Sequence, residues 1–239
     1  MADGLVADRP LPEAAPPAEP GTAQRASSWR QLPFLVLGSL VLAVVVKAFL
    51  VQAFFIPSGS MERTLHGCDG CTGDRVLVNK LLYDVRDVHR GEIVVFNGEG
   101  SWDTGADPGG GKDYVKRVIG LPGDRVACCT PDGQVTVQPA GQEGPVALDE
   151  PYLFEDDHQP FCAAGLGAAA CPPGADGMLI PADRLWVMGD HRSASADSRA
   201  NLDRPGHGTI PVDKVVGRAF VIVWPLTRAR VLSVPSIFS

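Results

Sequence analysis

An apolar band lies close to the N-terminus and is interrupted by a single cation. Residues 34–46 are uncharged, and the apolar residues resume after Lys47. A membrane-spanning helix needs about 20 residues, so the band is long enough only if Lys47 extends its ammonium group into the lipid headgroups. We therefore predict one transmembrane helix over residues 31–51. A cleaved signal peptide and a buried core helix are the alternatives.

Beyond this band, short runs rich in β-branched and aromatic residues alternate with turns that contain Gly and Asp. Such runs are typical of β-strands. The stretch 130–181 is irregular and is interpreted as an insertion carried on the β core. The predicted fold class is therefore mainly β. We expect strands over residues 75–78, 92–96, 114–120, 125–129, 184–189 and 218–224.

The first 30 residues are rich in Ala and Pro and contain almost no large apolar side chain. Such a segment buries too little surface to become ordered, so we expect a disordered tail. The predicted organisation has four parts. They are the tail over 1–30, the anchor over 31–51, the β core over 52–129 and 182–239, and the inserted cysteine-containing subdomain over 130–181.

Composition and charge narrow the function classes. The chain has 239 residues, of which 45% are hydrophobic, and this excludes disorder throughout. Its 21 Lys and Arg residues are outnumbered by 28 Asp and Glu residues, which gives a formal net charge of -7. Nucleic-acid binders need clustered basic residues to displace counterions. We therefore expect no nucleic-acid partner.

Two features of the sequence are candidates for chemistry. Ser58 and Ser60 flank a glycine shortly after the apolar band, and Lys116 lies within the predicted strand 114–120. Period-two alternation places Lys116 on the same strand face as Tyr114. Taken alone, the serine pair is weak evidence, and a lysine on an apolar face usually extends its ammonium group to solvent.

Four sequence blocks taken together change this interpretation. They are Ser58-Gly59-Ser60-Met61, Gly73-Asp74, the run from Tyr114 to Asp124 and the run from Gly189 to Arg199. In this order behind an apolar band, they resemble the bacterial type I signal peptidases. The resemblance implies a membrane-anchored Ser/Lys endopeptidase that removes signal peptides from exported preproteins, without a metal or an organic cofactor. It also implies an antiparallel β-sheet peptidase core with an inserted β-rich subdomain.

The resemblance makes Ser60 the nucleophile and Lys116 the general base. A serine hydroxyl is a weak nucleophile until a base takes its proton, and a lysine accepts a proton only when it is neutral. Burial among apolar groups lowers the pKa of a lysine from about 10.4 by up to about 3 to 5 units. The Ser58 hydroxyl and the Ser60 N–H are expected to stabilise the oxyanion.

The same resemblance assigns supporting roles in the last block. Ser195 is expected to form a hydrogen bond with the lysine amine, and Asp197 and Arg199 are expected to form an ion pair that braces their loop. A Ser-His-Asp triad that uses His191 beside Asp190 is an alternative source of the base.

Shallow apolar pockets are expected to select small side chains, with Ala-X-Ala preferred before the cut. The peptide main chain is expected to add a strand beside the segments that contain Ile56 and Tyr114. Ordinary core packing is the alternative for each pocket residue. The predicted pocket residues are Ile56, Met61, Leu65, Val76, Val95, Tyr114 and Val115.

The resemblance implies a single-pass protein of the plasma membrane, with a cytoplasmic N-terminus and an extracytoplasmic catalytic domain. Expected partners are preprotein signal peptides and the lipid bilayer, in proximity to the secretion translocon. Two rivals are a Ser/Lys peptidase that matures one secreted partner and an inactive anchored binding protein. The apolar residues 231–239 either pack on the β core or touch lipid. Near the anchor, Phe49, Phe54 and Phe55 are expected to enter the membrane interface.

Cysteines are the last feature of the sequence to interpret. Disulfides are chemically allowed outside the membrane. Six cysteines allow 15 pairings, and the sequence leaves the pairing open. Cys162 with Cys171 is a reasonable local pair, and Cys68 or Cys71 with Cys128 or Cys129 is a further candidate. Cys68 and Cys71 have the spacing of half a zinc site, but no second half with suitable spacing follows.

Overall fold

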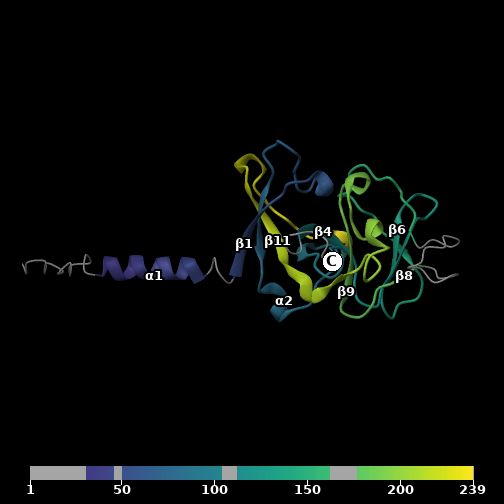
Figure 1. Ribbon diagram of the computed structural model, residues 1–239, viewed down its shortest axis with the longest axis horizontal. Helices are drawn as coiled ribbons and strands as arrows, with labels where there is room; N and C mark the ends of the chain where they lie inside the picture. Colours follow the sequence, from purple (N-terminus) through teal and green to yellow (C-terminus); the bar gives the residue numbers. More distant parts are fainter. Residues whose placement is uncertain (1–30, 46–49, 104–111, 162–176, 239) are drawn as a thin grey trace, which may run out of the picture. The chain divides into compact units, whose positions relative to one another are not determined.

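The computed structural model describes residues 31–45, 50–103, 112–161 and 177–238. The chain divides into two compact units, Met1–Leu42 and Ala43–Ser239. The predicted tail over residues 1–30 lies outside the described residues. Figure 1 shows the ribbon with its main elements labelled.

Helix α1 (Leu32–Val45) occupies part of the predicted anchor. Its 14 residues are almost entirely apolar, and the side chains described on it are exposed. Across the described ranges, no helix has both the length and the apolar character needed to cross a bilayer. Val51, the last residue of the predicted anchor, already belongs to strand β1.

The larger sheet has eight strands and is antiparallel. Its order is β1-β2-β11-β3-β4-β9-β10, and β12 pairs with β11. Figure 1 shows β1, β11, β4 and β9 following one another across the unit. The strands are β1 (Val51–Phe55), β2 (Arg75–Asn79), β3 (Ile93–Asn97), β4 (Asp113–Gly120), β9 (Arg184–Met188), β10 (Ile210–Pro211), β11 (Val215–Trp224) and β12 (Arg230–Val231).

Strand β3 shows why this sheet carries a core on each face. Ile93 and Val95 belong to one buried cluster, whereas Val94 and Phe96 belong to the other. Such alternation is the expected result of side chains pointing to opposite faces of a strand. Trp102, from the segment after β3, closes the second cluster, because its ring lies edge-on to Phe96 at 5.0 Å.

A smaller sheet of four strands has the order β7-β6-β5-β8. It begins at Arg125, somewhat before the predicted start of the insertion at residue 130. Phe161 stacks on Trp186 of β9 with ring centroids 5.0 Å apart, so the two sheets share a buried cluster. The strands are β5 (Arg125–Cys128), β6 (Val135–Gln138), β7 (Val146–Ala147) and β8 (Met178–Leu179).

Short helices connect the strands. The helix α2 (Leu82–Val85) follows β2, and η3 (Gly59–Met61) follows β1. Two further 3-10 helices follow β9, and the remaining ones lie near β11 and the C-terminus. Their bounds are η4 (Arg192–Ala194), η5 (Ser198–Asn201), η6 (Val212–Lys214), η7 (Leu226–Arg228) and η8 (Ser236–Phe238).

The prediction of a mainly β, antiparallel fold is confirmed. All six predicted strands occur, as β2, β3, β4, β5, β9 and β11. The prediction missed β1, because its residues continue the apolar band of the anchor. It also missed β6, which lies in the stretch interpreted as irregular, and the two-residue strands, which are too short to show alternation.

Part of the C-terminal segment packs on the β core, whereas Val231 is 74% exposed. Leu232 is buried, and its N–H donates to the Phe220 carbonyl at 2.8 Å. Phe238 packs against the cluster shared by the two sheets, and its ring lies 6.3 Å from that of Tyr152.

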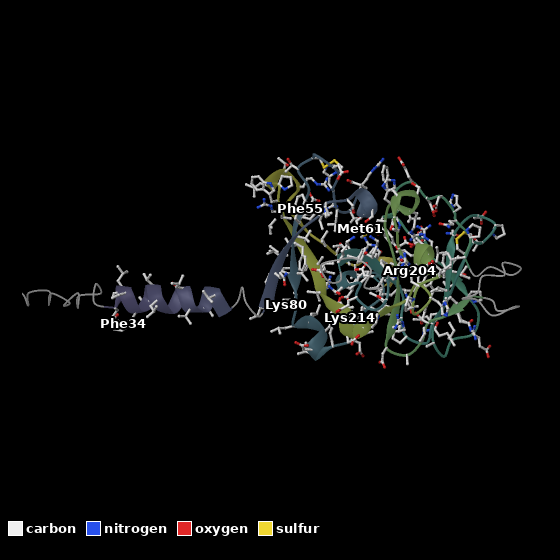
Figure 2. The ribbon with its side chains drawn as sticks, in the orientation of Figure 1. Phe34, Phe55, Met61, Lys80, Arg204 and Lys214 are labelled. Atoms are coloured by element: carbon white, nitrogen blue, oxygen red, sulfur yellow. A yellow bond between two sulfur atoms is a disulfide. The ribbon has the colours of Figure 1, made fainter. Side chains whose placement is uncertain are left out.

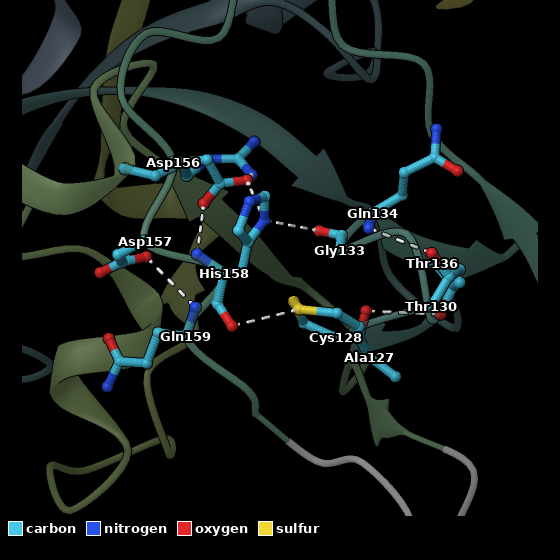
Figure 3. The surroundings of a disulfide bond; sticks show 12 residues. Ala127, Cys128, Thr130, Gly133, Gln134, Thr136, Asp156, Asp157, His158 and Gln159 are labelled. Atoms are coloured by element: carbon cyan, nitrogen blue, oxygen red, sulfur yellow. Dashed lines mark hydrogen bonds and ion pairs between the residues drawn. A yellow bond between two sulfur atoms is a disulfide. The ribbon is translucent and has the colours of Figure 1, made fainter.

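The candidate pairing of Cys68 or Cys71 with Cys128 or Cys129 is not formed. The structure joins Cys68 to Cys71 and Cys128 to Cys129. Both pairs are local: a turn in which the Cys71 N–H donates to the Cys68 carbonyl brings the first pair together. Figure 3 shows the second pair beside the carbonyl of His158. The predicted pair Cys162–Cys171 lies outside the described residues.

Candidate active site

Ser60 lies in the 3-10 helix η3, which begins four residues after the end of the edge strand β1. The residue is buried, and Figure 2 labels Met61, the next residue on this helix. Gly189, which follows β9, allows the chain to approach closely. A Cβ atom at Gly189 would lie 2.4 Å from the Ser60 carbonyl oxygen. The glycine therefore lets the loop after β9 pack directly on the backbone of Ser60.

Lys116 is the side chain that contacts the Ser60 hydroxyl. It lies on β4 with an exposed fraction of only 4%. Its Nζ donates to Ser60 Oγ at 2.9 Å and to the Val115 carbonyl at 3.1 Å. Burial lowers the pKa of Lys116 to about 8, although the negative charges of Asp197 and Asp190 oppose this shift. About a tenth of this lysine is therefore neutral at pH 7, far more than for an ordinary lysine.

Ser58 brings a second hydroxyl to the same place. Its Oγ donates to Ser60 Oγ at 3.4 Å, and the residue is exposed. Because Ser58 lies two residues before Ser60 in the turn that leads into η3, its hydroxyl is free to rotate toward a group bound at the nucleophile.

The predicted hydrogen bond between Ser195 and the lysine amine is not formed. Among the described residues, the buried Ser195 Oγ has no hydrogen-bond partner. The amine instead donates to the Ser60 hydroxyl and to the carbonyl of its own strand. A buried hydroxyl without a partner is uncommon in proteins, so its place beside Gly189 is consistent with a group that is satisfied only when the site is occupied.

Asp197 and Arg199 form a buried, bidentate ion pair. The guanidinium Nε lies 2.9 Å from Asp197 Oδ1, and its Nη2 lies 3.0 Å from Oδ2. Asp197 also accepts a hydrogen bond from the Gly189 N–H at 3.0 Å. The pair thus ties the loop after β9 to the end of that strand, next to Ser60.

Sequence reasoning missed a second buried ion pair. Arg117, the neighbour of Lys116, contacts both carboxylate oxygens of Asp190, at 2.8 and 2.6 Å. The sequence pattern indicates Asp190 only as a possible member of the alternative triad. The signal available in the sequence was an arginine inside an apolar strand, because a buried guanidinium requires an acidic partner.

The structure does not assemble a Ser-His-Asp triad from His191. Its Nδ1 lies 3.1 Å from the Gly59 carbonyl oxygen, and its Nε2 lies 3.3 Å from a carboxylate oxygen of Glu155. Both carboxylate oxygens of Asp190 bind Arg117 instead. The imidazole therefore lacks both partners that the alternative requires.

The inserted segment also supports the loop after β9. Arg192 is buried against Glu150, and Arg199 reaches Asp157 at 2.8 Å. Both acids belong to the predicted insertion. Because buried arginines need acidic partners, this segment contributes to the conformation of the active-site loop.

The structure brings six of the seven predicted pocket residues into one region. Tyr114 lies apart from them: its ring stacks on Phe96 at 5.6 Å, and its hydroxyl donates to Asp103 at 2.8 Å. Five of the six are buried, and Val115 is partly buried beside them. The six residues of this cluster are Ile56, Met61, Leu65, Val76, Val95 and Val115.

One group of side chains has the composition of a metal site. Ligand atoms of His66, Cys68 and Cys71 lie within 4.8 Å of one another, and sequence spacing had missed the histidine. The two sulfurs are joined in a disulfide. A disulfide sulfur is not the thiolate that zinc binds, so this group does not fit a metal ion in the oxidised state.

A serine hydroxyl held by a buried lysine of lowered pKa is the arrangement that a serine hydrolase with a lysine base requires. Comparisons with known proteins identify the family. A family model described as "Signal peptidase, peptidase S26" matches residues 29–224. The chain belongs to this family of peptidases.

Individual relatives are similar over most of their length. Signal peptidase I of Mycobacterium tuberculosis is 35% identical over 243 residues, which covers 90% of this chain and 79% of the relative. Probable signal peptidase I of Mycobacterium leprae is 37% identical over 209 residues, which covers 72% of this chain and 68% of the relative. A crystal structure of a signal peptidase I from Enterococcus faecalis is 24% identical and covers 56% of this chain and 97% of that chain, with a TM-score of 0.35.

Proposed function

We propose that this peptidase removes signal peptides from exported preproteins, with Ser60 as the nucleophile and Lys116 as the general base. The observation that carries the proposal is the 2.9 Å contact between Lys116 Nζ and Ser60 Oγ. The lowered pKa of the buried amine supports it, because only a neutral amine accepts the serine proton.

In the acylation step, Lys116 Nζ accepts the proton of the Ser60 hydroxyl while Ser60 Oγ bonds to the scissile carbonyl carbon. The carbonyl oxygen becomes an oxyanion, which the Ser60 N–H and the Ser58 hydroxyl stabilise. The carbon–nitrogen bond then breaks, and the Lys116 ammonium gives its proton to the leaving amine. This leaves an acyl-enzyme on Ser60.

In the deacylation step, Lys116 accepts a proton from water, and the resulting hydroxide attacks the acyl carbon. The bond to Ser60 Oγ breaks, and the serine recovers its proton from the lysine. Asp197 and Arg199 hold the loop against which Ser60 packs. Ser195, with its buried and unpaired hydroxyl, orients the amine in the occupied site.

The apolar cluster formed by six of the predicted pocket residues, Val115 among them, is proposed to select the substrate. Its apolar side chains lie beside η3, and we propose that they receive small side chains such as alanine. A preference for Ala-X-Ala before the cut is part of this proposal. Tyr114 packs in the other core, so its contribution is to the strand beside which the peptide is proposed to bind.

The site is proposed to act at the outer surface of the plasma membrane, with the N-terminus in the cytoplasm. Phe34, labelled in Figure 2, is 76% exposed on a helix that is apolar on all sides. Such a helix is stable in lipid and unfavourable in water. We propose that α1 is part of a single membrane anchor, and that the lipid bilayer and the secretion translocon lie close to the enzyme.

Phe55 supports a second contact with lipid. Its side chain is 54% exposed at the end of β1, and both Phe55 and Trp224 pair with Arg75 of β2. Exposed aromatic residues at one end of a sheet suit the membrane interface. Phe54 is partly buried in the core, so its contribution is smaller, and Phe49 lies outside the described residues.

Processing of a membrane-inserted preprotein tests this function. The full chain in lipid vesicles is expected to cut a preprotein after Ala-X-Ala, with the new N-terminus identified by mass spectrometry. A matched preprotein with Phe in place of the last Ala should remain intact. Cleavage at unrelated positions, or equal cleavage of both preproteins, would contradict the proposed specificity.

A further inference from the structure

His191 holds the backbone on both sides of the nucleophile. Its ring Nδ1 lies 3.1 Å from the carbonyl oxygen of Gly59, the residue before Ser60. Its main-chain N–H donates to the carbonyl oxygen of Ser60 at 3.2 Å. One residue from the loop after β9 thus contacts both of these carbonyl groups.

The first contact bears directly on the Ser60 N–H. The Gly59 carbonyl and the Ser60 N–H belong to the same planar peptide group. In a trans peptide these two groups point in opposite directions, so a donor that fixes the carbonyl oxygen also fixes the direction of the N–H. This N–H is the backbone donor proposed to stabilise the oxyanion.

We propose that His191 is a positioning residue, which aims the Ser60 N–H at the oxyanion through its bond to the Gly59 carbonyl. The inference rests on the proposed function of Ser60. The ring nitrogen that faces Gly59 carries a proton, because its neighbour is a carbonyl oxygen and accepts only. The histidine does not exchange a proton with Ser60 and is not a catalytic base.

The surroundings of His191 keep the ring in place. Its Nε2 lies 3.3 Å from Glu155, and the ring centroid lies 4.8 Å from that of Phe154. The Phe154 N–H donates to the Asp190 carbonyl at 2.9 Å. Two residues of the inserted segment therefore hold the imidazole against Gly59, which links this segment to the geometry of the oxyanion site.

A preorganised donor stabilises the transition state more than the bound substrate. Loss of the His191 side chain should therefore lower kcat and leave KM unchanged. Loss of a direct oxyanion donor costs about 100- to 1,000-fold in rate. A donor that is present but poorly aimed should cost less, about 10- to 100-fold.

The test compares His191→Leu with His191→Asn in the full chain, using a peptide substrate. The amide nitrogen of Asn occupies nearly the place of the imidazole Nδ1 and donates to the same carbonyl. We expect kcat to fall about 10- to 100-fold in His191→Leu with KM within about twofold, and to recover to within about threefold in His191→Asn. His89→Leu, the same change at an exposed histidine, is the control.

Wild-type kcat in His191→Leu overturns the inference, as does an equal loss in the Leu and Asn variants or a loss that appears only in KM. If His191→Leu does not fold, His191→Ala carries the same expectation. A Ser60→Ala variant measured in parallel separates the two claims. Activity in that variant contradicts the proposed function itself, whereas an inactive Ser60→Ala together with a fully active His191→Leu contradicts only the role of His191.

Discussion

Arg117 and Asp190 form a bidentate ion pair, with distances of 2.8 and 2.6 Å, between the strand of the general base and the loop that packs on the nucleophile. Arg117 follows Lys116 directly, and Asp190 precedes His191. The exposed fractions of the two residues are 2% and 0%. The pair therefore fixes β4 relative to this loop inside the protein, where a partnerless charge is costly.

Removal of one partner of this pair should destabilise the protein. Arg117→Met leaves the Asp190 carboxylate buried without its cation, and the expected loss in the free energy of unfolding is about 3 to 5 kcal/mol. Urea denaturation measures it. The control is Lys214→Met, which breaks an exposed pair with Glu99 and should cost at most about 1 kcal/mol. Equal stability of the two variants would contradict a structural role for the buried pair.

The pH dependence of cleavage should follow the titration of Lys116. Below pH 8 most of the amine is protonated, so kcat/KM should rise about tenfold per pH unit as the pH increases and level off above about 8. The measurement is the initial rate of peptide cleavage from pH 5 to pH 10, with folding checked at each pH. A rise centred near 10.5, the ordinary lysine value, would show that burial does not activate the amine.

The buried amine should also reduce stability. Its pKa is lower in the folded protein than the ordinary 10.5, so the unfolded chain binds the proton more tightly. Below pH 8 burial of the protonated amine therefore lowers the free energy of unfolding by its full amount. The free energy of unfolding recovers as the pH rises from about 8 to 10.5. We expect Lys116→Met to raise the free energy of unfolding at pH 7 by up to about 3 kcal/mol.

The matched control for that variant is Lys80→Met, at a partly exposed lysine labelled in Figure 2. It should leave the free energy of unfolding nearly unchanged. A Lys116→Met variant that is less stable than the wild type at pH 7 would contradict this prediction, because it would show that the buried amine stabilises the folded protein.

Ser58 is expected to contribute through its hydroxyl alone. Ser58→Ala should lower kcat by about 100- to 1,000-fold while KM changes little, because the oxyanion forms only after substrate has bound. Ser58→Thr retains the hydroxyl and should recover most of the rate. A Thr variant as slow as the Ala variant would indicate that the exposed serine is needed for its size.

The strands were the part of the fold most accessible from sequence. The short run of residues 75–78 contains two valines and follows a Gly-Asp turn, and this local pattern predicted β2 to within one residue. Val51–Phe55 has no alternation that separates it from the anchor, so β1 was missed. The order of the strands depends on pairings between distant segments, which no local pattern specifies.

The candidate site was likewise only partly predictable from the sequence. Ser60 and Lys116 were found through motifs, and the structure places them in contact, but their supporting contacts join residues far apart in the chain. Arg117 and Asp190 are one example, and the bond from His191 to Gly59 is another. The hydrogen bond expected between Ser195 and the amine is not formed, and this outcome depends on packing that the sequence does not show.

The most direct test of the account measures cleavage of a membrane-inserted preprotein by the wild type, Ser60→Ala, Lys116→Ala and Lys116→Arg across the pH range. The account predicts that all three variants are inactive at every pH, since an arginine remains protonated and cannot accept the serine proton. Thermal unfolding verifies that each variant is folded. Substantial cleavage by folded Lys116→Ala or Ser60→Ala would contradict the proposed dyad.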